Sequence, residues 1–333
     1  MNAILRRLAA MIFVVWGVVS LTFVINYALP GDPARAIAGP QARPSDLKKI
    51  RDQLGLARPL HEQYGLFLTR LVHPSFVGRD DKTRHVSCST FGPLHVDLGM
   101  SYQKRQPVGK LLGERLPATL LLALAATFVQ VAIGVGTGTI AALRRGTAVD
   151  TGIVTLTLLG ISAPTFVIGI ALQYVLAYRL RLLPLDGYGQ TFGERLAHVA
   201  LPALTLGLYG AAYYTRLVRD EVLTQEREDY VRTALAKGAS RTRVLFVHVL
   251  RNALVPLVTV IGLDLGALVG GAIVTEKLFR WPGVGRLAID AVAERDGPVI
   301  LGTVLLGSVA VVVASLVVDA SYGLLDPRGR KRT

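Results

Sequence analysis

The stretch DYVRTALAKGASRTRVLFVHVLRNALVP, residues 229–256, lies between two apolar segments, yet it is rich in arginine and lysine. Tyr230 to Lys237 is long enough for two turns of helix. Gly238 then interrupts, because glycine is a poor residue inside a helix and a good C-terminal stop. Ser240 is placed to cap a second helix that continues toward the next apolar segment. The sequence therefore predicts a rigid protrusion of two helices separated by a glycine, which a soluble partner could grip.

The composition is that of an integral membrane protein. The chain has 333 residues, 51% of them hydrophobic, and a mean hydropathy of +0.46, which soluble domains rarely reach. Several charge-free runs reach the roughly 20 apolar residues that span a bilayer. The net charge of +14 is scattered among these runs, so we attribute it to orientation in the lipid bilayer and expect no nucleic-acid partner. The single cysteine, Cys88, excludes an intramolecular disulfide.

Apolar runs predict six membrane-spanning helices. The first run follows Arg6 and Arg7 as in a signal peptide, but it is too long for one and lacks a clear cleavage site, so we interpret it as a retained span. The turn-forming cluster 30–33 ends it, and Pro164 is expected to kink the third span. The predicted spans are residues 8–29, 116–143, 151–178, 196–215, 252–275 and 299–318.

Lysine and arginine in the short loops predict the orientation. With the N-terminus inside, the inner pieces carry most of these residues, as the positive-inside rule requires. These pieces are 1–7, 144–150, 216–251 and the tail, against outer loops 179–195 and 276–298. The basic segment 32–116 exceeds the roughly 60 residues to which the rule applies. We therefore expect both termini and the 229–256 stretch in the cytoplasm, and 32–116 outside.

The fold class predicted is an all-α integral membrane protein with a long extracytoplasmic segment after its first helix. Residues 45–56 and 59–72 have apolar side chains at helical spacing, which predicts two short amphipathic helices there. The composition of 73–95 predicts a loop of unassigned role. The expected divisions are 1–31, a transmembrane helix; 32–116, the extracytoplasmic segment; 117–323, a five-helix core including the loop 216–251; and 324–333, a cytoplasmic tail.

The loop resembles the cytoplasmic loop of ABC-importer permeases, whose pattern is Glu-Ala-Ala, three residues, Gly. Arg232, Thr233 and Ala234 stand at its first three positions, without the glutamate, and Gly238 is its glycine. Arg-Thr-Ala at this place is typical of the dipeptide/oligopeptide (peptide/nickel) class. Further strings resemble the same class from residue 29 to residue 328: LPGDP at 29–33, DLGMSYQKRQPVGKLLGERLPATL at 97–120, EKLFRWPGVGRL at 276–287 and DPR at 326–328.

The resemblance implies the permease subunit of an ATP-driven importer of di- or oligopeptides, multi-pass in the bacterial cytoplasmic (inner) membrane. It implies three kinds of partner: a homologous second permease, ABC ATPase subunits and an extracytoplasmic substrate-binding protein. The loop around 229–243 would dock on the ATPase, and its expected contact residues are Tyr230, Arg232, Thr233, Ala234, Lys237, Gly238, Ala239 and Ser240.

Catalytic motifs are absent from the sequence. It holds no G-x-x-x-x-G-K-[ST] loop to bind nucleotide phosphates and no paired acids or Ser/His/Asp arrangement. We therefore expect a transport subunit without an ATPase site, which binds no cofactor itself, with ATP and magnesium held by the partner subunits.

Polar and small residues inside the spans are further candidates. Asp264 lies mid-span, where a carboxylate costs about 2.5–3.5 kcal/mol, so it should face protein or water. It could line the translocation path or be a hydrogen-bonded structural residue, and Gln130 and Gln173 are weaker candidates of the same kind. A small-residue stripe in the same span could pack against a second subunit or a moving helix, or within this chain's own helices; it consists of Gly262, Gly266 and Gly270.

Several alternatives stay open. Nickel or glutathione could be the cargo, because the binding protein largely selects it. The histidines His61, His73, His85 and His95 with Cys88 have ligand-type side chains, but their spacing is irregular and we assign no metal site. An ion-coupled secondary transporter would be expected to show several intramembrane charges and internal repeats, and a receptor would be expected to have a larger external core than 32–116.

Overall fold

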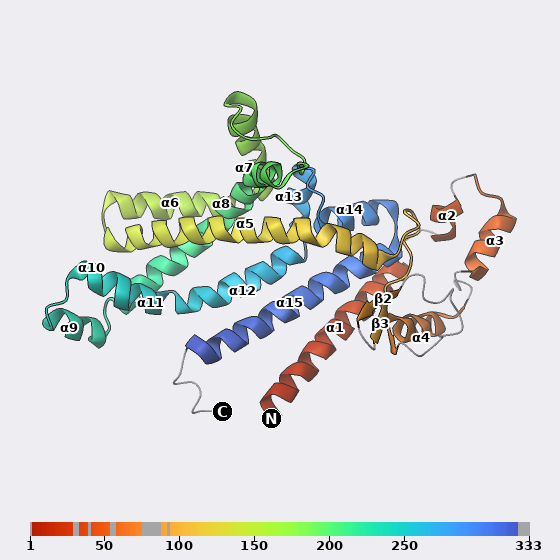
Figure 1. The fold of residues 1–333 in the computed structure, drawn as a ribbon, viewed down its shortest axis with the longest axis horizontal. Coiled ribbons are helices and arrows are strands. Elements are labelled where there is room, and N and C mark those ends of the chain that lie inside the picture. Colours follow the sequence, from red (N-terminus) through yellow and green to blue (C-terminus); the bar gives the residue numbers. More distant parts are fainter. Residues whose placement is uncertain are drawn as a thin grey trace. The chain divides into compact units, whose positions relative to one another are not determined.

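A computed structural model describes residues 2–28, 33–38, 41–53, 58–74, 88–91 and 94–325, and these are mostly helical (Figure 1). The chain forms two compact units. The first consists of residues 1–118 and 283–310, and the second of residues 119–282 and 311–333. Residues 283–310 are grouped with the N-terminal part in this division, and the divisions expected from the sequence stay a prediction. The predicted tail from residue 326 and the turn at 29–32 lie outside the described residues.

Three described helices are long and apolar enough to cross a membrane, and there are up to five candidate spans if each of two bent pairs counts as one. The helices are α5 (Val108–Leu143), α8 (Phe192–Gln225) and α15 (Gly297–Leu325). The first pair joins α6 (Ala148–Ser162) to α7 (Thr165–Leu172) and the π-helix η1 (Gln173–Arg179). The second joins α10 (Arg241–Val244), η2 (Leu245–Val249) and α11 (Leu250–Ala253) to α12 (Val255–Val269). Six spans and their orientation stay a prediction.

The kink predicted at Pro164 is confirmed, and it is a sharp bend of 105° between α6 and the helix formed by α7 and η1. Ala163 is extended, with φ −82° and ψ 130°, because the proline ring disfavours the helical conformation of the residue before it. The helix α8 extends beyond the span predicted at 196–215 at both ends. It begins earlier because Thr191 and Glu194 form a capping box. Its other end continues past Arg216 into the polar loop.

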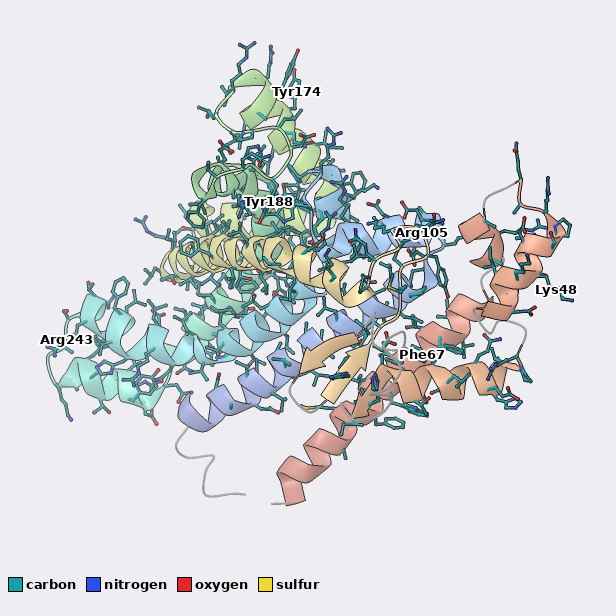
Figure 2. The ribbon with its side chains drawn as sticks, turned by 45° about the vertical axis from the view of Figure 1, so that its right-hand side comes forward. Lys48, Phe67, Arg105, Tyr174, Tyr188 and Arg243 are labelled. Carbon is teal, nitrogen blue, oxygen red and sulfur yellow. The ribbon has the colours of Figure 1, made fainter. Side chains whose placement is uncertain are left out.

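The first unit contains α1 (Asn2–Ala28), whose apolar part is Ala9–Ile25, and α4 (Leu60–Leu71), which packs on it. The Phe23 ring lies 5.3 Å from the Tyr64 ring and 5.4 Å from that of Phe67, centroid to centroid; Phe67 is labelled in Figure 2. The Tyr64 hydroxyl shares a 2.6 Å hydrogen bond with the Ser20 hydroxyl. The short helices α2 (Pro33–Ala38) and α3 (Pro44–Gln53) come between them in sequence.

A small antiparallel sheet corrects the all-α prediction and the loop predicted at 73–95. Its strands β1 (Val72–Pro74), β3 (Leu94–Asp97) and β2 (Cys88–Phe91) lie in that order, with His73 opposite His95. The strands have only three or four residues each, too few for alternation to stand out in the sequence. Residues 75–87, with His85, lie outside the described part.

The start of α5 and the α14–α15 junction form the core of the first unit. Helix α14 (Val284–Glu294) contributes Val284, Leu287 and Ala291 to a buried cluster with residues of α5 and α15. Asp296, 1% exposed, accepts hydrogen bonds from the Ser101 hydroxyl and from the backbone N–H of Tyr102 (3.1 Å). A buried carboxylate is stable when so paired, and it ties the segment before α5 to this junction.

The helices α5 and α8 pack closely in the second unit because glycines line their contact. A Cβ on Gly134 would lie 2.4 Å from Tyr214 Cβ, and one on Gly207 would lie 2.3 Å from Val129 Cγ1. Small residues let membrane helices approach to such distances. The hydroxyls of Thr137 and Thr215 share a 2.7 Å hydrogen bond across the same contact.

We expect Gly134→Val to destabilise the second unit, because the new side chain overlaps α8. Overpacking costs about 1–3 kcal/mol, which should lower the melting temperature of the detergent-purified chain by several degrees. Gly136→Val is the matched control, since a Cβ on Gly136 has nothing within 4 Å. Equal melting temperatures of the two variants would contradict the close packing of α5 on α8.

Candidate functional site

The loop between α8 and α12 contains the predicted helix, glycine and second helix. Helix α9 (Asp229–Ala236) ends where Gly238 takes φ +83°. The Gly238 N–H donates to the Leu235 carbonyl (2.9 Å) and the Ala239 N–H to the Ala234 carbonyl (3.2 Å). These two bonds form a Schellman motif, which satisfies carbonyls at the helix end. The glycine break predicted from sequence is therefore confirmed.

The second helix begins where it was predicted. The Ser240 side chain caps α10 by accepting a hydrogen bond from the Arg243 N–H (3.3 Å). The backbone then continues through η2 and α11 toward α12. A helix, a closed turn and a capped helix leave little of the loop without regular backbone bonding, so the α9–α10 loop (residues 229–244) is a rigid element.

One face of this loop is buried in the second unit. Val231, 6% exposed, belongs to a cluster with Val218 and Val222 of α8. The cluster also contains Val244, Leu245, Val249, Leu250, Ala253 and Leu257, and Tyr230, Ala234 and Ala239 pack against it. The Tyr230 hydroxyl donates to Gln225 Oε1 (2.7 Å) at the end of α8. Burial of these side chains fixes α9 to α8.

The opposite face of the loop is exposed and basic. Arg232, Lys237, Arg241 and Arg243 are all exposed, and Arg243 is marked in Figure 2. The Arg232 guanidinium is 3.8 Å from the Asp229 carboxylate, with side chains 76% and 98% exposed, so that pair contributes little to stability. Leu235 adds an apolar side chain, 42% exposed.

The eight predicted contact residues therefore lie in one loop but divide between its faces. Tyr230, Ala234 and Ala239 are half-buried against the cluster, and they anchor the loop. The exposed ones are Arg232, Thr233, Lys237, Gly238 and Ser240. These five are the residues that a partner could reach.

The three polar candidates of the predicted path have separate hydrogen-bond partners. Asp264 on α12 is half-buried and accepts a 2.8 Å hydrogen bond from the Tyr214 hydroxyl. Gln130 is 5% exposed, and its Nε2 donates to the Leu206 carbonyl at 3.4 Å while its side chain lies against Gly210. Gln173 Nε2 donates to the Leu185 carbonyl (3.1 Å). Gln130 therefore lies between α5 and α8, and path roles for all three residues stay predictions.

The glycine stripe of α12 packs at least partly within this chain. A Cβ on Gly262 would lie 2.1 Å from Val318 Cγ2 of α15, in the same unit. Gly266 is buried, and Gly270 is the residue that ends α12. Of the two alternatives for the stripe, packing against another subunit or moving helix and packing within this chain, Gly262 shows the second.

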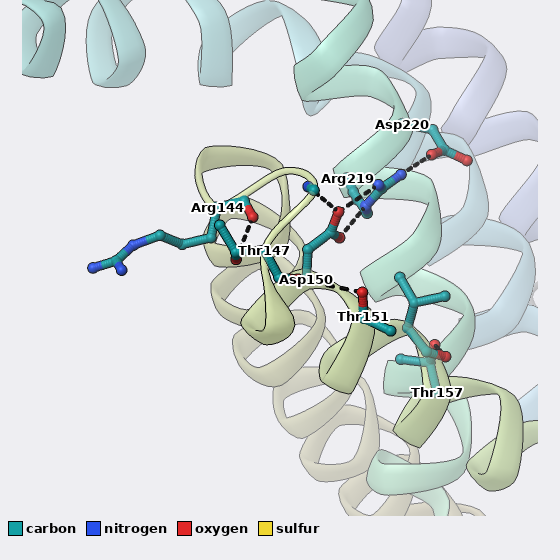
Figure 3. Close-up of polar contacts among 9 residues, drawn as sticks. Arg144, Thr147, Asp150, Thr151, Thr157, Arg219 and Asp220 are labelled. Carbon is teal, nitrogen blue, oxygen red and sulfur yellow. Dashed lines mark hydrogen bonds and ion pairs between the residues drawn. The ribbon is translucent and has the colours of Figure 1, made fainter.

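Sequence reasoning missed an ion pair between α6 and α8 (Figure 3). Arg219 Nε lies 2.7 Å from Asp150 Oδ1, and its Nη2 lies 2.9 Å from Oδ2. Asp150 is 5% exposed, and its Oδ2 also accepts a 3.0 Å hydrogen bond from the Gly146 N–H. The partners are 69 residues apart in sequence, so no local pattern could have paired them.

Metal-type ligands do not cluster in the described part of the chain, where no group of three His, Cys, Asp or Glu residues could hold an ion. The imidazoles of His73 and His95 meet edge to face across the sheet, with centroids 5.6 Å apart. His61 lies on α4, outside that pair of strands.

Both the N-terminal and the C-terminal part of the chain match known protein families. Residues 134–331 match the family described as the binding-protein-dependent transport system inner membrane component. Residues 1–123 match the N-terminal region of the same kind of membrane component. The two matches together extend over almost the whole sequence.

Curated relatives match along their whole lengths. The dipeptide transport system permease protein DppB of Escherichia coli (strain K12) is 36% identical over 356 residues, covering 99% of this chain and 98% of that protein. The glutathione transport system permease protein GsiC of Salmonella typhimurium is 39% identical over 327 residues, covering 98% of each. An inward-facing structure of the MetNI methionine ABC transporter shares the fold, with a TM-score of 0.54 at 18% identity, over 66% of this chain and 98% of that one.

We expect Val231→Asp to detach α9 from α8, because it buries a carboxylate without a partner in an apolar cluster. Hydrogen exchange of the α9 amides in the purified chain should become faster by about tenfold or more, since each 1.4 kcal/mol of lost local stability is a factor of ten. Leu235→Asp, on the exposed face of α9, is the control and should exchange like the wild type. Equal exchange in both variants would contradict the anchoring role of Val231.

Proposed function

Because the chain belongs to the family of binding-protein-dependent transport system inner membrane components and is a permease subunit of an ABC importer, we propose that it forms half of a path for short peptides and is driven through its α9–α10 loop. In this proposal a separate ATPase subunit binds the exposed face of the loop. The observation that carries it is the division of the loop into one buried, anchored face and one exposed, basic face.

The structure of the α9–α10 loop suits the transmission of force from a bound partner to the membrane-spanning helices. A displacement applied at the exposed face reaches the spans only if the loop moves as one body with them. The Schellman turn at Gly238 and the Ser240 cap keep the loop from bending, and burial of Val231 joins it to α8. The arginines and lysine of the exposed face suit a groove lined with acidic or hydrogen-bond-accepting groups.

The mechanism we propose is alternating access. Binding of ATP closes the ATPase subunits, and the α9–α10 loop moves with them as a rigid body. The Val231 cluster passes that movement to α8, and the hydrogen bond from Tyr214 to Asp264 links α8 with α12. No reactive group is needed on this chain, because its contribution is shape and contact; ATP and magnesium belong to the partner.

Partners, location and topology follow from the same proposal. If this chain forms one half of the path, a homologous second permease must form the other half. The family description names both a binding protein and the inner membrane. We propose an extracytoplasmic substrate-binding protein, ABC ATPase subunits and six spans, with both termini in the cytoplasm. The positive-inside distribution supports this orientation.

Short peptides are the proposed cargo. One relative is named for dipeptide transport and the other for glutathione, which is itself a small peptide. Both are matched along nearly their whole length at similar identity, so the shared chemistry, a peptide backbone with charged ends, is the class we propose. No observation on the described residues favours nickel.

Substitutions at Gly238 test whether uptake depends on the backbone conformation of the loop. Proline cannot adopt φ +83° and has no N–H to donate to Leu235, so Gly238→Pro should abolish ATP-driven uptake while the chain still inserts in the membrane. Gly238→Ala should weaken uptake, because a left-handed conformation costs about 1–2 kcal/mol, whereas Gly238→Asn should retain most of it. Wild-type uptake by the proline variant would contradict the docking role.

The cargo proposal is tested by competition. In proteoliposomes that contain the complete transporter and its binding protein, uptake of a labelled dipeptide should be inhibited by unlabelled dipeptides and by glutathione, and not by nickel chloride. Uptake of radioactive nickel without any uptake of peptide would contradict the proposal.

A further inference from the structure

The ion pair of Asp150 and Arg219 stands at the start of α6, directly after the turn that joins it to α5. The Thr147 hydroxyl donates to the Arg144 carbonyl (2.6 Å), and Gly146 takes φ +75° and donates to Asp150. Figure 3 shows the Asp150 carboxylate between this turn and Arg219, while the Arg144 side chain extends away from them. The carboxylate therefore joins the turn to α8.

Helix α6 packs along α8, but few of its side chains are buried. Within it only Asp150 and Thr157 are buried, and the Thr157 hydroxyl is used inside the helix, donating to the Val154 carbonyl. A Cβ on Gly160 would meet Ala212 of α8 at an ordinary 3.5 Å. The remaining contact is that of apolar side chains with no fixed direction, so the ion pair is the directional bond at this end of α6.

Arg219 itself belongs to the part of α8 that carries the α9–α10 loop. It lies between Val218 and Val222, which pack with Val231 in the buried cluster. The Arg219 side chain is 22% exposed and also contacts Asp220 at 3.2 Å. Any displacement of α8 by the loop therefore moves the guanidinium that holds Asp150.

We propose that Asp150 and Arg219 are positioning residues that carry the movement of the α9–α10 loop to α6, and so to the bent α6–α7 pair. This inference rests on the proposed function of the loop. A two-bond guanidinium–carboxylate pair fixes distance and direction together, which apolar contact does not. Neither residue touches cargo or nucleotide in this role.

The test compares Asp150→Asn, Arg219→Gln and the double variant in proteoliposomes of the complete transporter, with ATP hydrolysis and dipeptide uptake measured together. Asparagine still accepts the Gly146 N–H, so the turn is retained. We expect hydrolysis to continue while uptake falls, raising the ATP used per peptide by about fivefold or more, as for a coupling energy of 1 kcal/mol or above. The double variant should be no worse than either single one, because the pair acts as a unit.

Arg144→Gln, in the same turn but exposed, is the matched control and should behave like the wild type. A proportional fall in hydrolysis and uptake with a lower melting temperature, or an unchanged ATP-to-peptide ratio, would overturn the inference. Gly238→Pro is measured in parallel. If that variant transports normally, the proposed function of the loop fails; if it is inactive while Asp150→Asn is fully coupled, only the present inference fails.

Discussion

Burial of the Val231 side chain against α8 is the interaction on which the attachment of the α9–α10 loop to the membrane helices depends. It turns a basic, mostly exposed segment into part of the helical core, because the short helix α9 could not be stable alone. Val218 and Val222 receive it, and the helix end is closed by the Gly238 turn. A loop held in this way is displaced together with α8, so its exposed residues and the membrane helices form one mechanical element.

Small residues and paired polar groups complete that element. The glycines between α5 and α8 allow their backbones to approach, and Thr215 and Gln130 are buried in the same contact. The polar links Tyr214–Asp264 and Asp150–Arg219 connect α8 to α12 and to α6. A helix with directional bonds to two neighbours can transmit rotation as well as translation, as the proposed alternating access requires.

Features that depend on near neighbours in sequence could be predicted, and features that depend on distant partners could not. The helix of α9, the stop at Gly238, the Ser240 cap and the bend at Pro164 follow from local backbone preferences. The ion pair of Asp150 with Arg219 forms between segments far apart in the chain, and the strands of the sheet are too short for alternation to stand out in the sequence. The sequence also could not show that Tyr230, Ala234 and Ala239 anchor the loop, because only their burial against the cluster distinguishes them from the exposed residues.

The most direct test of the central claim is purification of the tagged chain from its native host in mild detergent, with identification of the co-eluting proteins by mass spectrometry. A protein driven through the α9–α10 loop should elute with an ATPase that carries a phosphate-binding G-x-x-x-x-G-K-[ST] loop and with a second, related permease. A chain that elutes alone, and still transports when it is reconstituted alone, would contradict the account and identify an ion-coupled transporter instead.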